Sequence, residues 1–377
     1  MGLALVPFVA LGLGRFAYGL LLQPMRSDLG WTYTDAGLLT TSNSIGYLIG
    51  AFAASKAIRR VGAVRAVRIG LWGMAASLLV NGLTGAFVPM LAIRLATGVF
   101  GAVAFVAGGV LAARLSATDV RWTLVAYPAG AAAAIAVTAI VIPQIVVADS
   151  QWPLGWFFMA GLAVVCALSF GTLLGRLRDS ERGTESVAKT PARLPRPELA
   201  YGLFGLGYIA YVTFAVAYLE DGGATPTNVT AFWLVLGIAA MAATILWRRM
   251  ESVGRDRSVL ATTIGGCTLG VTVLIIGRTL PFAMASALFF GASFLATVTA
   301  VTTLARDRLP ESAWAAAIGR LTVVFGFGQI LGPVIAGLFG DSRSGLRAGL
   351  AFSAITLAAG TLVALSIRPL PPNASNA

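Results

Sequence analysis

Residues 11–18 read LGLGRFAY and residues 204–211 read FGLGYIAY, so nearly the same phrase occurs twice, 193 positions apart. Each copy lies in the first long apolar run of its half of the chain. At the same offset, Gly98 matches Gly291, and both glycines lie inside later apolar runs. A repeat of about half the chain indicates a duplicated unit of helices rather than a short solenoid.

The composition is that of an integral membrane protein. Hydrophobic residues make up 58% of the 377 positions and charged residues only 11%, whereas a soluble domain is about a quarter charged. Histidine is absent, which removes the commonest metal ligand and the usual side chain that titrates near neutral pH. The two cysteines, Cys166 and Cys267, lie in apolar runs and form no disulfide framework. We expect a chain embedded in the lipid bilayer, without metal or cofactor.

Apolar runs long enough to cross a bilayer need about 20 residues each, and the chain contains twelve of them. One long polar stretch, 177–197, separates the sixth run from the seventh and is predicted to be a linker. The sequence therefore predicts an all-α integral membrane protein with twelve transmembrane helices in two six-helix pseudo-repeats, residues 1–176 and 198–377. The predicted spans are 3–23, 36–55, 66–86, 88–113, 122–147, 153–175, 198–219, 229–248, 259–277, 280–304, 312–339 and 346–367.

The basic residues are sorted by loop. Of the 27 lysines and arginines, twenty lie in the termini and the loops after even-numbered spans, and four lie in the other loops. Because positive loops stay on the inner side, this bias predicts a cytoplasmic membrane protein with both termini and the linker in the cytoplasm. Residues 180–195 should then be cytoplasmic and residues 220–227 extracytoplasmic. The same sorting explains the net charge of +12 without a nucleic acid partner.

Three arginines, Arg15, Arg94 and Arg320, fall within predicted spans, whereas every acidic residue lies in or beside a loop. A buried cation needs an anion, backbone carbonyls or water. Arg15 takes the position of Tyr208 in the other repeat and lies about twelve residues into its span. We expect an anionic substrate to supply the missing charge at these arginines. Arg94, nearer the outer end of its span, has the alternative of hydrogen bonds to carbonyls of a neighbouring helix.

Tyrosines and one asparagine are spaced to line a cavity with these arginines. Tyr18 follows the first-span arginine by three residues, on one face of an α-helix. Asn43 and Tyr47, four residues apart, share a face of the second span. Tyr208 and Tyr211 belong to a tyrosine stripe on the seventh span. Packing between helices is the alternative for the tyrosine stripe.

The eleventh span contains two polar residues that could face the cavity. Arg320 and Gln329 are nine residues apart, which is about half a turn around an α-helix. Both therefore cannot face one cavity in an unbroken helix, and we expect Arg320 to be the one that does.

No motif for catalysis is present: histidine, a deep carboxylate and a phosphate-binding loop are all missing. This favours transport over a membrane-embedded enzyme; a transporter-like sensor is a third alternative. The lack of a deep titratable group also predicts uniport, anion exchange, or symport in which the substrate carries the proton. Glu220, at the outer end of the seventh span, is the least implausible proton site on the protein.

Twelve spans in two sets of six around a cytoplasmic linker resemble the major facilitator superfamily, over the whole chain. The cytoplasmic signature of that family is similar to Glu251-Ser-Val-Gly254-Arg255 after span eight. The copy after span two keeps Arg60 and Gly62 but lacks the acidic residue. Arg94-x-x-x-Gly98 is similar to the arginine motif of the family in span four.

Two further stretches carry the resemblance. Gly328-Gln-Ile-Leu-Gly332-Pro333 looks like the glycine–proline motif, which normally lies in span five. Gly14-Arg15-Phe16-Ala17-Tyr18-Gly19, together with Asp28-Leu-Gly-Trp31, resembles the YbfB-like branch. The resemblance implies a secondary transporter that works by alternating access between two halves, with a small-molecule substrate.

We therefore expect a monomer, not an enzyme, that moves a small organic or oxyanionic solute across the membrane. Export of amphipathic or drug-like compounds is the alternative. The predicted substrate-binding residues are Arg15, Tyr18, Asn43, Tyr47, Arg94, Tyr208, Tyr211 and Arg320, and the predicted gating residues are Arg60, Gly62, Glu251, Gly254 and Arg255.

Overall fold

The computed structural model describes residues 2–115, 120–174, 193–251 and 257–368, and these residues form helices without any strand. The first membrane span is composite, because its helix type changes along its length. Its parts are η1 (Gly2–Ala4), α1 (Leu5–Pro7), the π-helix η2 (Phe8–Phe16) and α2 (Tyr18–Leu29).

The other spans of the first half are single helices. They are α3 (Tyr33–Val61), α4 (Ala63–Asn81), α5 (Phe87–Leu115), α6 (Val120–Ile145) and α7 (Trp152–Leu174), with the short η3 (Asp149–Gln151) before α7. The second half consists of α8 (Pro195–Glu220), α9 (Pro226–Glu251), α10 (Arg257–Ile276), α11 (Leu280–Arg308), α12 (Glu311–Gly340) and α13 (Leu346–Leu365).

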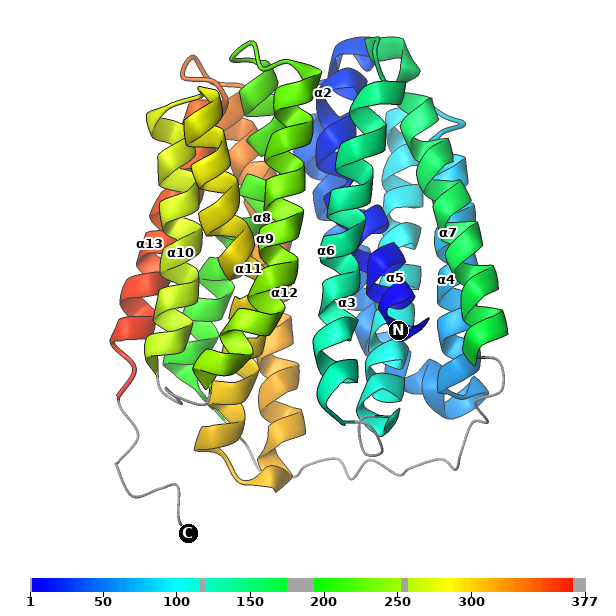
Figure 1. Ribbon diagram of the computed structural model, residues 1–377, viewed down its shortest axis with the longest axis vertical. Coiled ribbons are helices and arrows are strands. Elements are labelled where there is room, and N and C mark those ends of the chain that lie inside the picture. The colour runs from blue at the N-terminus through cyan, green and yellow to red at the C-terminus, as the bar shows by residue number, and fades with distance from the viewer. Residues whose placement is uncertain (1, 116–119, 175–192, 252–256, 369–377) are drawn as a thin grey trace.

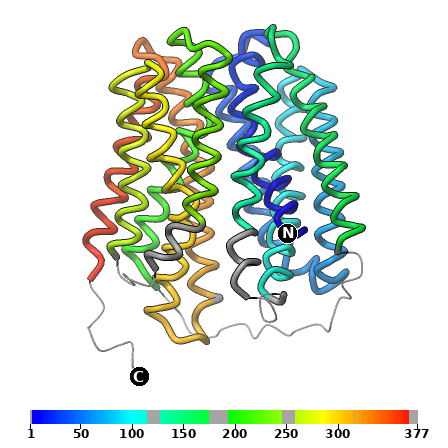
Figure 2. The backbone as a smooth tube through the Cα atoms, in the orientation of Figure 1, coloured from blue at the N-terminus to red at the C-terminus, as the bar shows by residue number. Residues whose placement is uncertain are grey.

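The helices form two bundles that stand side by side, α1–α7 in one and α8–α13 in the other (Figures 1 and 2). This confirms the predicted fold class. Eleven helices among the described residues are long and apolar enough to cross a membrane. The remaining span, α3, carries the polar run TTSNS at residues 40–44 in its middle. Most of the predicted linker lies outside the described residues, and its last three residues begin α8.

The internal repeat is visible as one packing contact made twice. A Cβ atom added to Gly98 of α5 would lie 2.1 Å from the carbonyl oxygen of Asn43 on α3. A Cβ atom added to Gly291 of α11 would lie 2.5 Å from the carbonyl oxygen of Leu236 on α9. Both members of the second pair lie 193 positions after their counterparts in the first. Small residues let helix backbones approach this closely in a membrane.

The two bundles meet along α6 and α9, along α3 and α12, and along α2 and α8. We call the end where α7 stops and α8 starts the linker end, which is the lower end in Figure 1, and the opposite end the distal end. At the distal end the Asp341 carboxylate, in the second half, accepts hydrogen bonds from the backbone N–H groups of Tyr33 at 2.7 Å and Thr34 at 2.9 Å. Asp221 accepts one from the Gln23 side chain at 3.2 Å. The halves are therefore hydrogen-bonded to each other there.

Backbone packing closes the same end. A Cβ atom on Gly37 of α3 would lie 2.4 Å from the carbonyl oxygen of Pro333 on α12. One on Gly337 would lie 2.6 Å from the carbonyl oxygen of Tyr33. The helices of the two halves thus touch at the distal end with no room for a side chain between them.

Candidate substrate site

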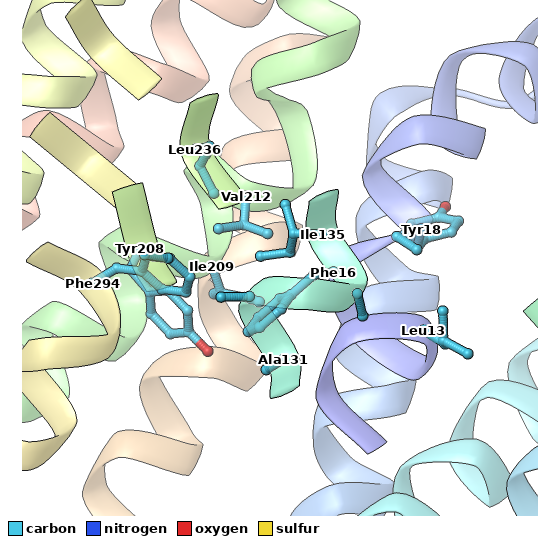
Figure 3. Packing of buried hydrophobic residues seen from close by; sticks show 14 of the residues in the cluster. Leu13, Phe16, Tyr18, Ala131, Ile135, Tyr208, Ile209, Val212, Leu236 and Phe294 are labelled. Carbon is cyan, nitrogen blue, oxygen red and sulfur yellow. The ribbon is translucent and has the colours of Figure 1, made fainter. Parts of the chain in front are cut away.

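The first span changes from α-helix to π-helix at Phe8, and the π-helix contains most of the repeated phrase, residues 11–16. The Ala17 N–H donates to the carbonyl oxygen of Gly12 at 2.9 Å, five residues earlier. Short π-helical segments are frequent at functional sites. This one brings Arg15 and Phe16 to the boundary between the halves, where the Phe16 ring packs edge-on against Phe294 at 5.7 Å (Figure 3).

Arg15 is buried, with 5% of its surface exposed. Its guanidinium donates to the amide oxygen of Gln329 on α12 at 3.1 Å and to the hydroxyl of Ser44 on α3 at 3.0 Å. It also lies over the ring of Tyr47, 4.9 Å from the ring centre. Its Nε has no hydrogen-bond partner, and no carboxylate of the described residues lies within ion-pair distance. The cation is held by neutral groups and keeps donor capacity.

Gln329 connects the two halves through this arginine. While its oxygen accepts from Arg15, its amide nitrogen donates to the hydroxyl of Tyr208 on α8. Arg15 and Tyr208 are equivalent positions of the repeat, and the structure brings both to one polar cluster at the interface. Arg320 and Gln329 lie about half a turn apart on α12, and Gln329 is therefore the one that faces this polar cluster.

A small pocket opens next to this cluster, between α3 and α12. It contains about 230 Å³ of empty space, part of it open to solvent. The pocket runs from the level of Gln329 toward the linker end, because α3 proceeds to that end and α12 starts from it. It is lined by Ser44, Tyr47, Leu48, Ala51, Thr322, Phe325, Gly326 and Gln329.

Phe325, which lines the pocket, belongs to a stack of parallel aromatic rings. Phe325 of α12 stacks on Tyr201 of α8, with ring centres 4.4 Å apart and an interplanar angle of 7°. Phe204 and Tyr208 continue the stack, each within 13° of parallel to its neighbours. Tyr208 thus takes part in both the ring stack and the polar cluster.

Two of the predicted site tyrosines, Tyr18 and Tyr211, do not line the pocket. Tyr18 does not share the face of Arg15, because the π-helical turn between them changes the angle per residue. Its hydroxyl donates to the carbonyl of Ala36 at 3.1 Å, and its side chain points away from Tyr208 (Figure 3). Tyr211 is buried inside the second half, bonded to Ser286 at 2.7 Å.

Arg94 and Asn43 are buried inside the first half and do not line the pocket. Arg94 donates to the carbonyl oxygen of Gly14 at 2.9 Å and lies over the rings of Tyr18 and Trp156. Arg94 therefore bonds a backbone carbonyl of a neighbouring helix, which is the alternative that the sequence left open for it. Asn43 in turn donates to the carbonyl oxygen of Arg94 at 3.2 Å. These contacts tie α5 to the π-helical segment and to α3.

Arg320 has a carboxylate partner, which corrects the prediction that it lacks one. Its Nε and Nη2 donate to the two oxygens of Glu198 at 3.0 and 2.9 Å, and 43% of its side chain is exposed. The reason is the length of α12: its 30 residues extend about 45 Å, more than the hydrocarbon thickness of about 30 Å. The first turns of α12 therefore have room outside the bilayer core, and Arg320 pairs near the linker end.

The predicted gating residues are partly described. Arg60 is exposed near the end of α3. Gly62 ends that helix with φ of 85°, a conformation that favours glycine, and so turns the chain into α4. Glu251 ends α9, while Gly254 and Arg255 lie outside the described residues.

Of the pocket residues, sequence reasoning named Tyr47, and through the repeat it also named Arg15 and Tyr208 of the adjacent polar cluster. It missed Ser44, Thr322 and Phe325 and set Gln329 aside. The signal for Gln329 was a lone amide in a glycine-rich apolar helix, which is costly to bury without a partner. Nothing in the sequence marked Phe325 out from the other phenylalanines.

Comparison with known proteins assigns the chain to a family. A family described as "Uncharacterised MFS-type transporter YbfB" matches residues 7–365. The chain belongs to this family. The resemblance seen in the sequence to the major facilitator superfamily and its YbfB-like branch is thereby confirmed. No functionally curated protein matches the chain.

Solved structures of transporters are similar to this YbfB-family chain in fold. The nucleoside transporter NupG, in a point-mutant form, aligns with a TM-score of 0.77 and 14% identity over 97% of this chain and 98% of that chain. A bacterial homologue of the human lysosomal transporter Spinster, inward-facing and occupied, aligns with a TM-score of 0.72 and 13% identity over 97% and 95%. At such identities the likeness supports the fold of this YbfB-family member and nothing about its substrate.

Proposed function

We propose that this YbfB-family transporter moves a small organic or oxyanionic solute across the cytoplasmic membrane by alternating access, and that Arg15 binds the anionic group. Membership of a transporter family supports the coarse activity. The observation that carries the finer proposal is the guanidinium of Arg15, which is buried between the halves without a carboxylate among the described residues. A cation in that position gains most from an anionic ligand.

The arrangement around Arg15 supports binding of one carboxylate or phosphate group. A guanidinium is a planar fork of five donors that matches such groups in a bidentate manner. Arg15 donates hydrogen bonds to Gln329 and Ser44, and its Nε has no hydrogen-bond partner. Gln329 bonds both Arg15 and Tyr208, so a ligand at Arg15 would lie near the hydroxyl of Tyr208.

Alternating access is supported by the unequal closure of the two ends. Asp341, Asp221 and the glycine contacts join the halves at the distal end, while the pocket extends toward the linker end. With the linker in the cytoplasm, as the positive loops predict, this is a cytoplasm-facing state. Transport would break the distal contacts and close the pocket from the other side.

The proposed coupling needs no deep carboxylate. We propose uniport, anion exchange, or symport with a proton carried by the substrate. Glu220 ends α8 at the distal end, away from Arg15, and its Oε2 is buried without a partner among the described residues. A Glu220→Gln variant that lost pH-driven uptake but kept exchange would contradict this coupling.

The experiment is a thermal-shift screen of the purified protein. Benzoate, succinate and inorganic phosphate are compared with benzyl alcohol and uridine as neutral probes, in wild type and Arg15→Gln. We expect at least one anion to raise the melting temperature of the wild type and none to do so for the variant. A compound that stabilises both proteins equally would contradict an anion site at Arg15. Counterflow of the stabilising anion in proteoliposomes then tests transport.

Export of amphipathic compounds is the second candidate, and the stacked rings beside the pocket favour it. In the same screen, a lipophilic cation such as ethidium that stabilises the protein, when none of the anions does, would favour the exporter.

A further inference from the structure

We propose that Arg94 is a positioning residue for Arg15, and that it acts by fixing the two backbone segments that carry Arg15 and Ser44. This role rests on the proposed anion site and adds the residue that sets its geometry. Arg94 is buried inside the first half and does not line the pocket, so it acts through its neighbours.

The contacts of Arg94 complete a closed ring of bonds that includes the anion site. Its Nη1 donates to the carbonyl oxygen of Gly14 at 2.9 Å, and Gly14 directly precedes Arg15. Its own carbonyl oxygen accepts from the Asn43 side chain at 3.2 Å, and Asn43 directly precedes Ser44. The ring closes where the Arg15 guanidinium donates to the Ser44 hydroxyl at 3.0 Å. Both partners of this last bond are therefore attached to Arg94 through the residue before them.

The second copy of the internal repeat lacks this ring. At the offset of 193 positions, the residues Arg15, Asn43, Ser44 and Arg94 correspond to Tyr208, Leu236, Gly237 and Ala287. The glycine contact is nevertheless made in both copies, by Gly98 against α3 and by Gly291 against α9. Close packing of these helices therefore does not require the polar ring, which occurs only in the half that carries the buried cation.

The backbone beside Arg15 differs between the copies as well. Residues 11–16 are π-helical, whereas their counterparts, residues 204–209, lie in the α-helix α8. The carbonyl of Gly14 accepts from Arg94, whereas the equivalent carbonyl of Gly207 accepts from the Ser353 hydroxyl at 2.6 Å. Because the direction of a side chain depends on the helix type, a bond that holds the Gly14 carbonyl helps to decide where the Arg15 guanidinium lies.

Stability alone does not account for an arginine at position 94. The residue is fully buried, and its Nε and Nη2 have no hydrogen-bond partner. No carboxylate of the described residues lies within ion-pair distance of it. Burial of a charge without a charged partner costs free energy, so an apolar side chain of similar length should be tolerated here. A residue that breaks the rules of burial in this way is typical of a functional site.

The first test of this role needs no ligand. The full-length protein is labelled with ¹⁵N-arginine, and the Nε–H signal of Arg15 is identified by its absence in Arg15→Gln. We expect this signal to shift or to broaden in Arg94→Met, which removes the bond to Gly14. Asn43→Leu, which introduces the residue of the second copy and opens the ring on the α3 side, should shift the signal too.

Ser42→Ala is the matched control for both variants. Its hydroxyl also joins α3 to α5, since it donates to the carbonyl oxygen of Leu91 at 2.6 Å, but it is not part of the ring. The Arg15 signal should keep its wild-type position in this variant. An equal shift in Ser42→Ala would mean that any bond between α3 and α5 has this effect, and would overturn the role of Arg94.

The second test measures the affinities of benzoate, succinate and inorganic phosphate by calorimetry. For whichever anion binds the wild type, Arg94→Met should bind it about three- to tenfold more weakly, which is the effect of losing one hydrogen bond. The melting temperature should stay unchanged or rise, because a buried charge is removed. Arg94→Lys keeps one donor for the Gly14 carbonyl and should bind the anion more tightly than Arg94→Met.

The outcomes separate this role from the proposed function. A wild-type Arg15 signal in folded Arg94→Met and Asn43→Leu would overturn the positioning role. Wild-type anion affinity in an Arg94→Met protein with a lowered melting temperature would do the same and leave Arg94 with a structural role. If the Arg15 signal shifts as expected but the anions bind Arg15→Gln as tightly as the wild type, or do not bind the wild type, Arg94 positions Arg15 and the anion site itself is wrong.

Discussion

The guanidinium of Arg15 and the amide oxygen of Gln329 are 3.1 Å apart, although 314 positions separate the two residues in the chain. Each belongs to a different half, and each is buried. This hydrogen bond joins the halves at mid-height, between the closed distal end and the pocket. A transporter that rocks about its centre keeps its substrate site at such a point.

Replacement of Gln329 by glutamate should place a carboxylate of the protein itself in the anion site. In Gln329→Glu a carboxylate takes the place of the amide oxygen and pairs with Arg15, so an external anion is no longer needed. We expect the thermal shift with benzoate, succinate or phosphate to disappear while the unliganded melting temperature rises above that of Gln329→Leu. An anion response of wild-type size in Gln329→Glu would show that ligands do not use Arg15.

The distal closure should depend on Asp341. Its carboxylate bonds the first two N–H groups of α3 across the interface, whereas Thr32 and Asp35 cap the same helix end within one half. Hydrogen bonds to a charged group contribute about 1.5–3 kcal/mol, and about 1.4 kcal/mol is a tenfold change in population. Asp341→Asn should therefore shift the population toward states that are open at the distal end.

Spin labels measure this shift. Ser27 and Ser344 are exposed at the distal end of the two halves, and cysteines there can carry the labels. In Asp341→Asn we expect longer label distances by electron–electron resonance. Asp35→Asn, which weakens the cap without touching the interface, is the control and should keep the wild-type distribution. Identical distributions in all three proteins would show that Asp341 does not hold the halves together.

Glycine spacing in α12 should matter only where helices touch. A Cβ atom at Gly328 would lie 2.3 Å from the carbonyl oxygen of Gly202 on α8, whereas one at Gly319 would meet nothing within 4 Å. Overpacking costs about 1–3 kcal/mol, so Gly328→Ala should lower the melting temperature. Gly319→Ala should leave it unchanged or raise it, because alanine favours the helix. Equal melting temperatures for the two variants would contradict the close α8–α12 approach.

The charge bias predicts the orientation in the membrane. Thr225 precedes α9 at the distal end, and Ser186 lies in the predicted linker, outside the described residues. In a background with Cys166 and Cys267 replaced by alanine, a membrane-impermeant thiol reagent should label Thr225→Cys in intact cells and spare Ser186→Cys. The opposite labelling pattern would reverse the orientation and make the observed state outward-facing.

Much of the fold could be predicted from the sequence, because lipid imposes simple rules on length and polarity. Twelve apolar runs and the repeat at residues 11–18 and 204–211 predicted the helices and their division into two halves. The site was harder. Arg15 and Tyr208 were found because the repeat compares equivalent positions, and a cation in one of them has no packing explanation.

The positions that these side chains take in the structure have physical causes that a residue pattern does not contain. Tyr18 was placed beside Arg15 by α-helical spacing, but the chain between them is π-helical. Arg320 was taken as deep because its span is apolar, but α12 is long enough to bring it near Glu198. Phe325 gained its place from a stack of rings contributed by another helix, which only the tertiary structure defines.

The central claim is that Arg15 binds the anionic group of the substrate, and the affinity of Arg15→Gln for benzoate, succinate and phosphate tests it most directly. Tyr211→Phe, inside the second half and one turn from Tyr208, is the control that leaves the pocket unaltered. We predict that Arg15→Gln folds and loses at least about tenfold in affinity for whichever of these anions binds the wild type, because a hydrogen bond to a charged group contributes about 1.5–3 kcal/mol. Wild-type affinity in a folded Arg15→Gln protein would contradict the account and leave Arg15 with a packing role.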